Sequence, residues 1–296
     1  MTVSLTNFQF KSRQKSKTDF QKRTQNYLHR LGRFNIVRQA YSAIQSQNQK
    51  FDAINHIKRL KLENQTIFSQ LNVDECVAQV EQTAVYQGLE LPANIVNQIY
   101  KFAVNTPCTE PKFAGKFFAE DVINGKLNSQ GRHVMRGLVS NTEQCQAIDK
   151  IIRDPLLIEI VRKYLKYYPT LITKHLTWSF ATSLPESEIQ KIYPPTNFHY
   201  DVAGYNFMTI SFYLTDVDLN SGPHVMIKHS HRSKPLQMLL GSNTHTDSTI
   251  FNHYGSDNQI YITGKKGFGF VQDSSCIHKL NPPVTGDRLI LQIRYS

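Results

Sequence analysis

The spacing of apolar residues changes near residue 170 of this 296-residue chain, and that change most constrains the fold. Upstream, apolar residues recur three or four positions apart, as on one face of a helix. Downstream of Leu171 the period is two, and turn-forming residues separate the runs. Strands are predicted at 171–182, 198–201, 207–217, 224–228, 259–263, 268–272 and 288–295. Helices followed by closely spaced strands predict an α+β protein with a mainly β core.

The first 66 residues form a basic segment whose composition differs from that of the rest of the chain. Residues 1–20 are polar and have little to bury, so we expect a frayed terminus. Amphipathic spacing from about 20 to 62 predicts one or two helices. Such helices either pack on the body of the protein or lie on an anionic membrane, and packing on the body is the commoner outcome. We therefore interpret 1–66 as a helical extension.

Residues 67–296 are predicted to form the main domain, helical over 67–168 and β-rich over 169–296. Within the helical part, capping signals predict helices at 72–87, at 91–102 and from Asp154-Pro155 onward. The stretch 106–128 is rich in turn formers and aromatic residues. We interpret it as an irregular covering loop.

The net charge of +11 is concentrated at the N-terminus. Residues 1–63 contain thirteen Lys or Arg against three acidic residues, so this segment carries +10 and the rest is nearly neutral. A uniformly basic protein would suggest nucleic-acid or membrane contact. Here the charge belongs to the extension, so nucleic acid is not an expected partner and peripheral membrane contact is not favoured.

The sequence also predicts the cellular compartment and the state of the cysteines. No apolar run approaches the roughly eighteen residues of a membrane span, and the first residues lack a signal pattern, so the cytoplasm is the expected location. The cysteines are widely spaced and form no Cys-x-x-Cys pair. We expect reduced, buried thiols at Cys76, Cys108, Cys145 and Cys276.

Two predicted strands have one apolar and one polar face. In 207–215 the even positions are apolar, whereas the other face carries Thr209, Ser211 and Tyr213. In 288–295 the odd positions are apolar and the other face begins with Arg288. Either a solvated outer sheet or a polar cavity between sheets would give this pattern.

His199 and Asp201 are candidate metal ligands. One residue apart in an extended segment, they project to the same face and lead into a strongly alternating strand. His278 follows another predicted strand and supplies a third ligand. Two imidazoles and one carboxylate favour a non-haem ferrous iron site with open positions for a co-substrate and dioxygen. A second pair, His245 and Asp247, lies in a polar loop and is predicted to be solvated surface.

Arg288 and Arg294 are candidate anion-binding residues. Arg288 lies ten residues beyond His278, at the start of the last strand. Its planar fork could grip the distal carboxylate of a dicarboxylate co-substrate such as 2-oxoglutarate. Arg294 shares that face by strand parity, and either an anionic substrate or a simple salt bridge would account for it. For His224, His229 and His231, placement on the surface or beside the site is favoured over a second metal.

These residues, in this order, resemble the phytanoyl-CoA dioxygenase superfamily of iron(II)- and 2-oxoglutarate-dependent oxygenases over roughly 171–295. The resemblance rests on His199-Tyr-Asp201, Asn220-Ser-Gly-Pro-His224, Gly267-Phe-Gly-Phe-Val271, Ile277-His278 and Gly286-Asp-Arg288. The family's small glycine before Ser230 is replaced by His229. The resemblance implies a double-stranded β-helix, that is, a cupin-like jelly roll, with the N-terminal helices packed outside.

The resemblance also implies the roles of the site residues and the reaction. His199, Asp201 and His278 would bind Fe(II), Arg288 would bind the far carboxylate of 2-oxoglutarate, and Ser211 would contact the co-substrate. No catalytic residue beyond the metal site is expected. Dioxygen and 2-oxoglutarate would give succinate and carbon dioxide while a small organic substrate is oxidised, and the retained aspartate favours hydroxylation over halogenation.

Three substrate classes and two other functions stay open at this point. A small polar metabolite, a natural-product intermediate and an acyl thioester are all compatible with the resemblance. A nucleic-acid oxidative demethylase is suggested by the spacing of Arg288 and Arg294 and by the basic arm, but no base-reading hairpin is found. A non-catalytic cupin-like binding protein is the other alternative, and the intact ligand set argues against it.

Overall fold

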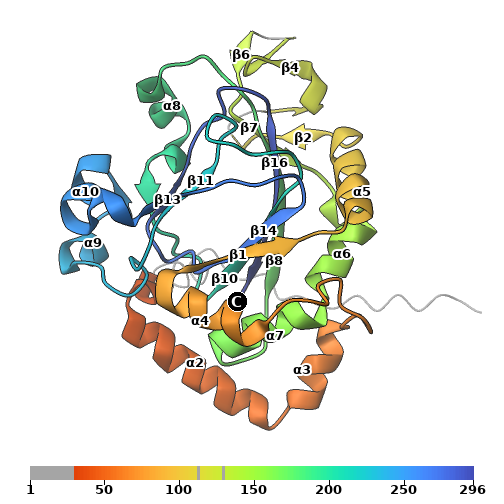
Figure 1. Ribbon diagram of the computed structural model, residues 1–296, viewed down its shortest axis with the longest axis vertical. Coiled ribbons are helices and arrows are strands. Elements are labelled where there is room, and N and C mark those ends of the chain that lie inside the picture. Colours follow the sequence, from red (N-terminus) through yellow and green to blue (C-terminus); the bar gives the residue numbers. More distant parts are fainter. Residues whose placement is uncertain (1–29, 112–113, 129–130) are drawn as a thin grey trace, which may run out of the picture.

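Two antiparallel sheets form the centre of the molecule in the computed structural model, which describes residues 30–111, 114–128 and 131–296 (Figure 1). The frayed terminus expected at 1–20 lies outside these residues. The larger sheet has the strand order β1 (Val85–Glu90), β14 (Phe268–Gln272), β10 (Met208–Tyr213), β16 (Arg288–Tyr295), β8 (Ile172–Ser179), β7 (Arg136–Val139), β2 (Cys108–Thr109) and β3 (Lys116–Phe117).

The smaller sheet carries the candidate metal ligands. Its strand order is β12 (Thr244–His245), β9 (Phe198–His199), β15 (His278–Leu280), β11 (His224–Ile227) and β13 (Gln259–Ile262). A third, peripheral sheet consists of β4 (Val122–Ile123), β5 (Lys126–Leu127) and β6 (Arg132–His133). All seven strands predicted from the period of two are present, and β14 and β16 have the predicted bounds.

The two larger sheets face each other. Tyr213 and Ile290 of the larger sheet pack in one buried cluster with Met226 and Ile262 of the smaller sheet. The opposite face of the larger sheet is apolar and packs against α4 to α7 in the main core. The alternation read from β10 and β16 is confirmed, and its polar face lines the space between the sheets rather than solvent.

Helices surround this pair of sheets. They are η1 (Arg30–Arg33), α2 (Asn35–Lys50), α3 (Ala53–Leu60), α4 (Val73–Thr83), α5 (Ala93–Val104), α6 (Gln146–Ile152), α7 (Pro155–Leu165), α8 (Glu186–Ile192), α9 (Leu236–Leu240) and α10 (Asp247–Tyr254). The predicted caps of α4 and α7 are confirmed, because Asn72 and Asp154 each accept two backbone N–H groups of the first turn.

The stretch 67–168 is not helical throughout, which corrects the prediction from sequence. The helix expected at 72–87 ends at Thr83, because Ala84 adopts a left-handed conformation with φ of 76°. The chain then forms β1, which pairs with β14 nearly two hundred residues away. The expected irregular loop at 106–128 contains four short strands, β2 to β5. The distant partner of β1 leaves no local signal, and strands of two residues carry no period.

Helix α2 of the N-terminal extension packs on the body through polar side chains. Its buried residues are Arg38, Ser42 and Gln49, whereas Ile36 and Phe51 are 76% and 85% exposed. Packing on the body was the favoured expectation, but the contact is made by hydrogen bonds rather than by an apolar stripe.

Within the described chain, no helix combines the length and hydropathy needed to cross a membrane. All four cysteines are buried and free, as predicted.

Candidate metal centre

The three candidate ligands come together where β9 and β15 pair. His278 of β15 lies directly opposite His199 of β9, and Asp201 follows β9 closely. The Nε2 atoms of both histidines are 3.9 Å from Oδ1 of Asp201, and all three ligand atoms lie within 4.8 Å of one another. Over the ranges that the structure describes, this is the one cluster of His, Cys, Asp or Glu able to hold a metal ion.

Backbone carbonyls orient both imidazoles. Nδ1 of His199 is 2.9 Å from the carbonyl oxygen of Asn197, and Nδ1 of His278 is 2.9 Å from that of Cys276. Because a carbonyl only accepts, each Nδ1 carries the proton and each Nε2 presents its lone pair to the centre of the cluster. Burial, with a smaller effect from His199, lowers the pKa of His278 to about 4. The neutral ligand is therefore the prevailing form near neutral pH.

Arg294 holds the carboxylate of the triad. Its Nη2 donates to Oδ2 of Asp201 at 2.6 Å, while Oδ1 faces the two histidines. A charge-assisted bond on one oxygen fixes the carboxylate plane and leaves the other oxygen for a metal. Of the two readings of Arg294 from sequence, the salt bridge is the one present, and its partner is the candidate ligand itself.

Arg288 is a buried cation that has no acidic partner among the residues described by the structure. The side chain is 0% exposed, and its guanidinium donates to the carbonyl of Gly222 and, at 2.9 Å, to Oγ of Ser179. Its Nε has no partner, and burial lowers its pKa. Burying an unpaired charge is costly. The environment therefore favours an anionic ligand, as a carboxylate of 2-oxoglutarate would be.

Further unpaired polar atoms lie in the same interior. Oγ of Ser211 and Nε2 of His224 are buried and have no hydrogen-bond partner within the described ranges. The His224 ring centroid is 5.2 Å from that of His278, and burial followed by the charges of His278 and Arg288 places its pKa well below the ordinary value. Native interiors rarely leave such groups unsatisfied unless a ligand or water completes them. The His224 ring therefore lies beside the candidate ligand His278 and near enough to Arg288 for that charge to lower its pKa.

The sequence favoured a place on the surface or beside the site for His224, and the structure places it beside the site. The alternation of side chains along the strand could have predicted this position. His224 and Met226 share a face of β11, and Met226 lies opposite His278. The neighbouring His229 adopts φ of 65°, a conformation that favours the glycine usual in the resembled family. Its Nδ1 donates to the carbonyl of Gln82, which fixes the turn.

The second His-x-Asp pair is not solvated loop, which corrects that prediction. His245 belongs to β12, where Thr244 lies opposite His199 and His245 opposite Phe198. The His245 ring stacks on Tyr200 with 6.2 Å between centroids. Asp247 begins α10 and accepts from Nζ of Lys279 at 2.8 Å. A two-residue strand has no periodicity of its own, so only its partner reveals it.

Comparisons with known proteins show a shared fold. No family model and no curated protein matches the sequence. Among solved structures, the non-haem α-ketoglutarate-dependent epimerase SnoN from nogalamycin biosynthesis is similar at 13% identity, with a TM-score of 0.51 over 75% of this chain and 82% of that one.

Two further solved structures are similar to this chain at comparable sequence identity and TM-score. HygX from Streptomyces hygroscopicus, with nickel, 2-oxoglutarate and hygromycin B bound, is 12% identical, with a TM-score of 0.50 over 75% of this chain and 86% of that one. EctD from S. alaskensis, with 2-oxoglutarate and 5-hydroxyectoine, is 14% identical, with a TM-score of 0.50 over 79% of this chain and 78% of that one. The chain therefore has the fold of 2-oxoglutarate-binding proteins, consistent with the resemblance seen in its motifs.

Proposed function

We propose that this protein is a non-haem iron(II)- and 2-oxoglutarate-dependent oxygenase acting on a small organic substrate. The observation that carries the proposal is the combination of a two-histidine, one-carboxylate cluster with a fully buried arginine that has no acidic side chain beside it in the described part of the chain. That donor set suits ferrous iron and leaves coordination positions open. The fully buried Arg288 provides the matching contact for a dicarboxylate.

The side chains have separable tasks in this proposal. His199, Asp201 and His278 would hold Fe(II), and Arg294 keeps the carboxylate in place. Arg288 would bind the distal carboxylate of 2-oxoglutarate, with Ser211 as a further polar contact. Bound iron supplies the redox chemistry in which dioxygen and 2-oxoglutarate become succinate and carbon dioxide while the substrate is oxidised. The protein orients the reactants and limits access of water.

The proposal extends to architecture and substrate class. We assign the two facing sheets as a double-stranded β-helix, with residues 67–296 as the catalytic domain and 1–66 as its extension. A small polar metabolite or natural-product intermediate is the favoured substrate, since SnoN comes from nogalamycin biosynthesis and HygX was solved with hygromycin B bound. Hydroxylation is the favoured outcome because Asp201 retains the carboxylate that halogenating relatives lack.

The two other functions are less well supported. Arg294 is engaged by Asp201, so the pair of arginines that suggested a nucleic-acid demethylase does not offer two cations to a phosphate backbone. A non-catalytic binding protein has no need of both imidazoles aligned on one carboxylate oxygen. An oxygenase accounts for the cluster and for the buried cation together.

A decarboxylation screen tests the proposal. Iron-loaded protein would be assayed with 2-oxoglutarate for succinate formation across panels of metabolites, acyl thioesters and amino acids. We expect stimulation by one panel and loss of that turnover in His199→Ala. Succinate formation that is equal in wild type and His199→Ala, or absent with every panel and without added substrate, would favour the binding-protein alternative.

A further inference from the structure

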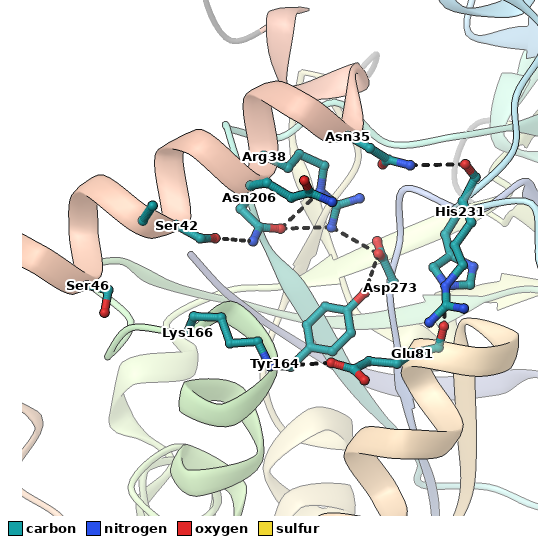
Figure 2. A pocket seen from close by; sticks show the side chains of 13 residues that line it. Asn35, Arg38, Ser42, Ser46, Glu81, Tyr164, Lys166, Asn206, His231 and Asp273 are labelled. Carbon is teal, nitrogen blue, oxygen red and sulfur yellow. Dashed lines mark hydrogen bonds and ion pairs between the residues drawn. The ribbon is translucent and has the colours of Figure 1, made fainter.

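Arg38 is one of several side chains through which helix α2 contacts the body of the protein. Arg38 is 7% exposed, and Figure 2 shows its guanidinium among polar side chains along a cavity of about 550 Å³. Its Nε and Nη2 donate to Oδ1 of Asn206 at 3.0 and 2.8 Å. Nη2 also donates to Asp273 at 2.9 Å, and Nη1 donates to Oγ of Ser275. Arg38 therefore connects three groups on two separate segments.

The carboxylate of Asp273 is held in its charged form at this point. Tyr164 donates its hydroxyl to Oδ2 of Asp273, and the backbone N–H of Ser275 donates to Oδ1 at 2.9 Å. Burial is the largest single influence and raises the pKa of Asp273, but the charges of Arg38 and His231 and the hydrogen bonds from Tyr164 and Arg38 together outweigh it, so the pKa lies below its ordinary value. The pair is buried and fully hydrogen-bonded, which is the condition under which an ion pair fixes one geometry.

The segment held by Arg38 orients two of the three metal ligands. The carbonyl oxygen of Ser274 accepts the backbone N–H of Asp201 at 3.0 Å. The carbonyl oxygen of Cys276 accepts Nδ1–H of His278 at 2.9 Å. Ser275, whose hydroxyl contacts Arg38, lies between these two carbonyls. The loop 273–277 thus contacts both Arg38 of α2 and two of the candidate ligands, so a shift of α2 would displace those ligands.

We propose that Arg38 is a positioning residue for the metal centre, so that the N-terminal extension is part of the active-site architecture. This inference rests on the proposed function and deepens it. Only arginine supplies a fork of donors able to reach Asn206, Asp273 and Ser275 together, and lysine offers a single ammonium point. Loss of outer-shell partners typically weakens metal binding by about 10–100-fold. Arg38 acts one layer further out, so the lower end of that range, about tenfold, is expected.

The test compares full-length variants that loosen α2 in different places. Arg38→Met combined with Asp273→Asn removes the clamp without leaving a buried, unpaired carboxylate. Gln49→Ala is the matched control, because Gln49 also anchors α2, through two hydrogen bonds to the backbone of Tyr168 at 2.8 and 2.7 Å, but does not contact the loop. Arg38→Lys tests whether charge alone suffices.

Two readouts separate this inference from the proposed function. Anaerobic Fe(II) titration should show about tenfold weaker binding in the double variant, little recovery in Arg38→Lys, and wild-type binding in Gln49→Ala. Hydrogen exchange of the 273–278 amides in metal-free protein should accelerate in the double variant and not in Gln49→Ala. Unchanged affinity and exchange in the double variant would overturn the positioning role, as would equal losses in Gln49→Ala. If wild type binds no metal while exchange still responds as expected, the clamp stands and the proposed function fails.

Discussion

Two His-x-Asp motifs lie on neighbouring strands of the smaller sheet, and among the described residues one of them belongs to a cluster that could hold a metal ion. His199 and Asp201 belong to β9 and the residues after it, and His245 and Asp247 to β12 and the start of α10. Each aspartate has a cationic partner, Asp201 with Arg294 and Asp247 with Lys279. The motifs are thus alike in sequence and in charge pairing.

Their difference lies in the strands beside them. Strand β9 has β12 on one side and β15 on the other, so His278 is brought directly opposite His199. Strand β12 is at the edge of the sheet, with a neighbour on one side only. The Nε2 atom of His245 is buried, and no described residue forms a hydrogen bond with it. A His-x-Asp motif therefore becomes a ligand set when pairing supplies a third ligand, and motif identity alone does not decide it.

The largest expected effect comes from replacing one histidine in each motif. His199→Ala should weaken Fe(II) binding by more than the roughly 10–100-fold typical for loss of an outer-shell partner, because a direct ligand is removed. His245→Ala should bind Fe(II) as wild type does. Anaerobic titration of metal-free protein measures both. Comparable losses in the two variants would mean that β12 belongs to the metal site.

A smaller effect is expected from the cations near each motif. Arg288→Gln should raise the KM for 2-oxoglutarate by about 30-fold or more, since losing one partner of a buried charge pair costs about 2 kcal/mol or more. Lys279→Gln, which removes the partner of Asp247, should leave that KM unchanged. Initial rates of succinate formation at varied 2-oxoglutarate give both values. An unchanged KM in Arg288→Gln would remove Arg288 from the co-substrate site.

The two ion pairs themselves give the third comparison. Arg294→Gln should weaken Fe(II) binding by about 10–100-fold, because Oδ2 of Asp201 loses its donor. Asp247→Asn should leave metal binding intact and change the free energy of unfolding by about 1 kcal/mol or less, as is usual for a partly exposed pair. Metal titration and denaturant unfolding provide the two readouts. Equal metal affinity in Arg294→Gln and wild type would show that the carboxylate is oriented by other contacts.

Local patterns in the sequence predicted the parts of the fold that repeat locally. Strands β14 and β16 appeared at their predicted bounds because alternation persists along them. Strand β1 was missed, since the left-handed turn at Ala84 that separates it from α4 has no distinctive residue. Strand β12 was missed because two residues carry no period.

In the candidate site, too, local patterns could be predicted and contacts between distant segments could not. His199, Asp201 and His278 were proposed from residue type and spacing, and parity placed Arg294 on the same face as Arg288. The partner of Arg294 could not be predicted, because it depends on how β9 lies across from β16. Arg38 gave no signal, since Asn206 and Asp273 lie 168 and 235 residues away.

The most direct test of the account is an anaerobic titration of Fe(II)-loaded protein with 2-oxoglutarate, followed by visible absorption. If His199, Asp201 and His278 hold iron and Arg288 anchors the co-substrate, a new charge-transfer band should appear and saturate at one 2-oxoglutarate per chain. The same titration on His199→Ala should give no band. A wild-type protein that binds neither Fe(II) nor 2-oxoglutarate, or one whose band persists in His199→Ala, would contradict the central claim.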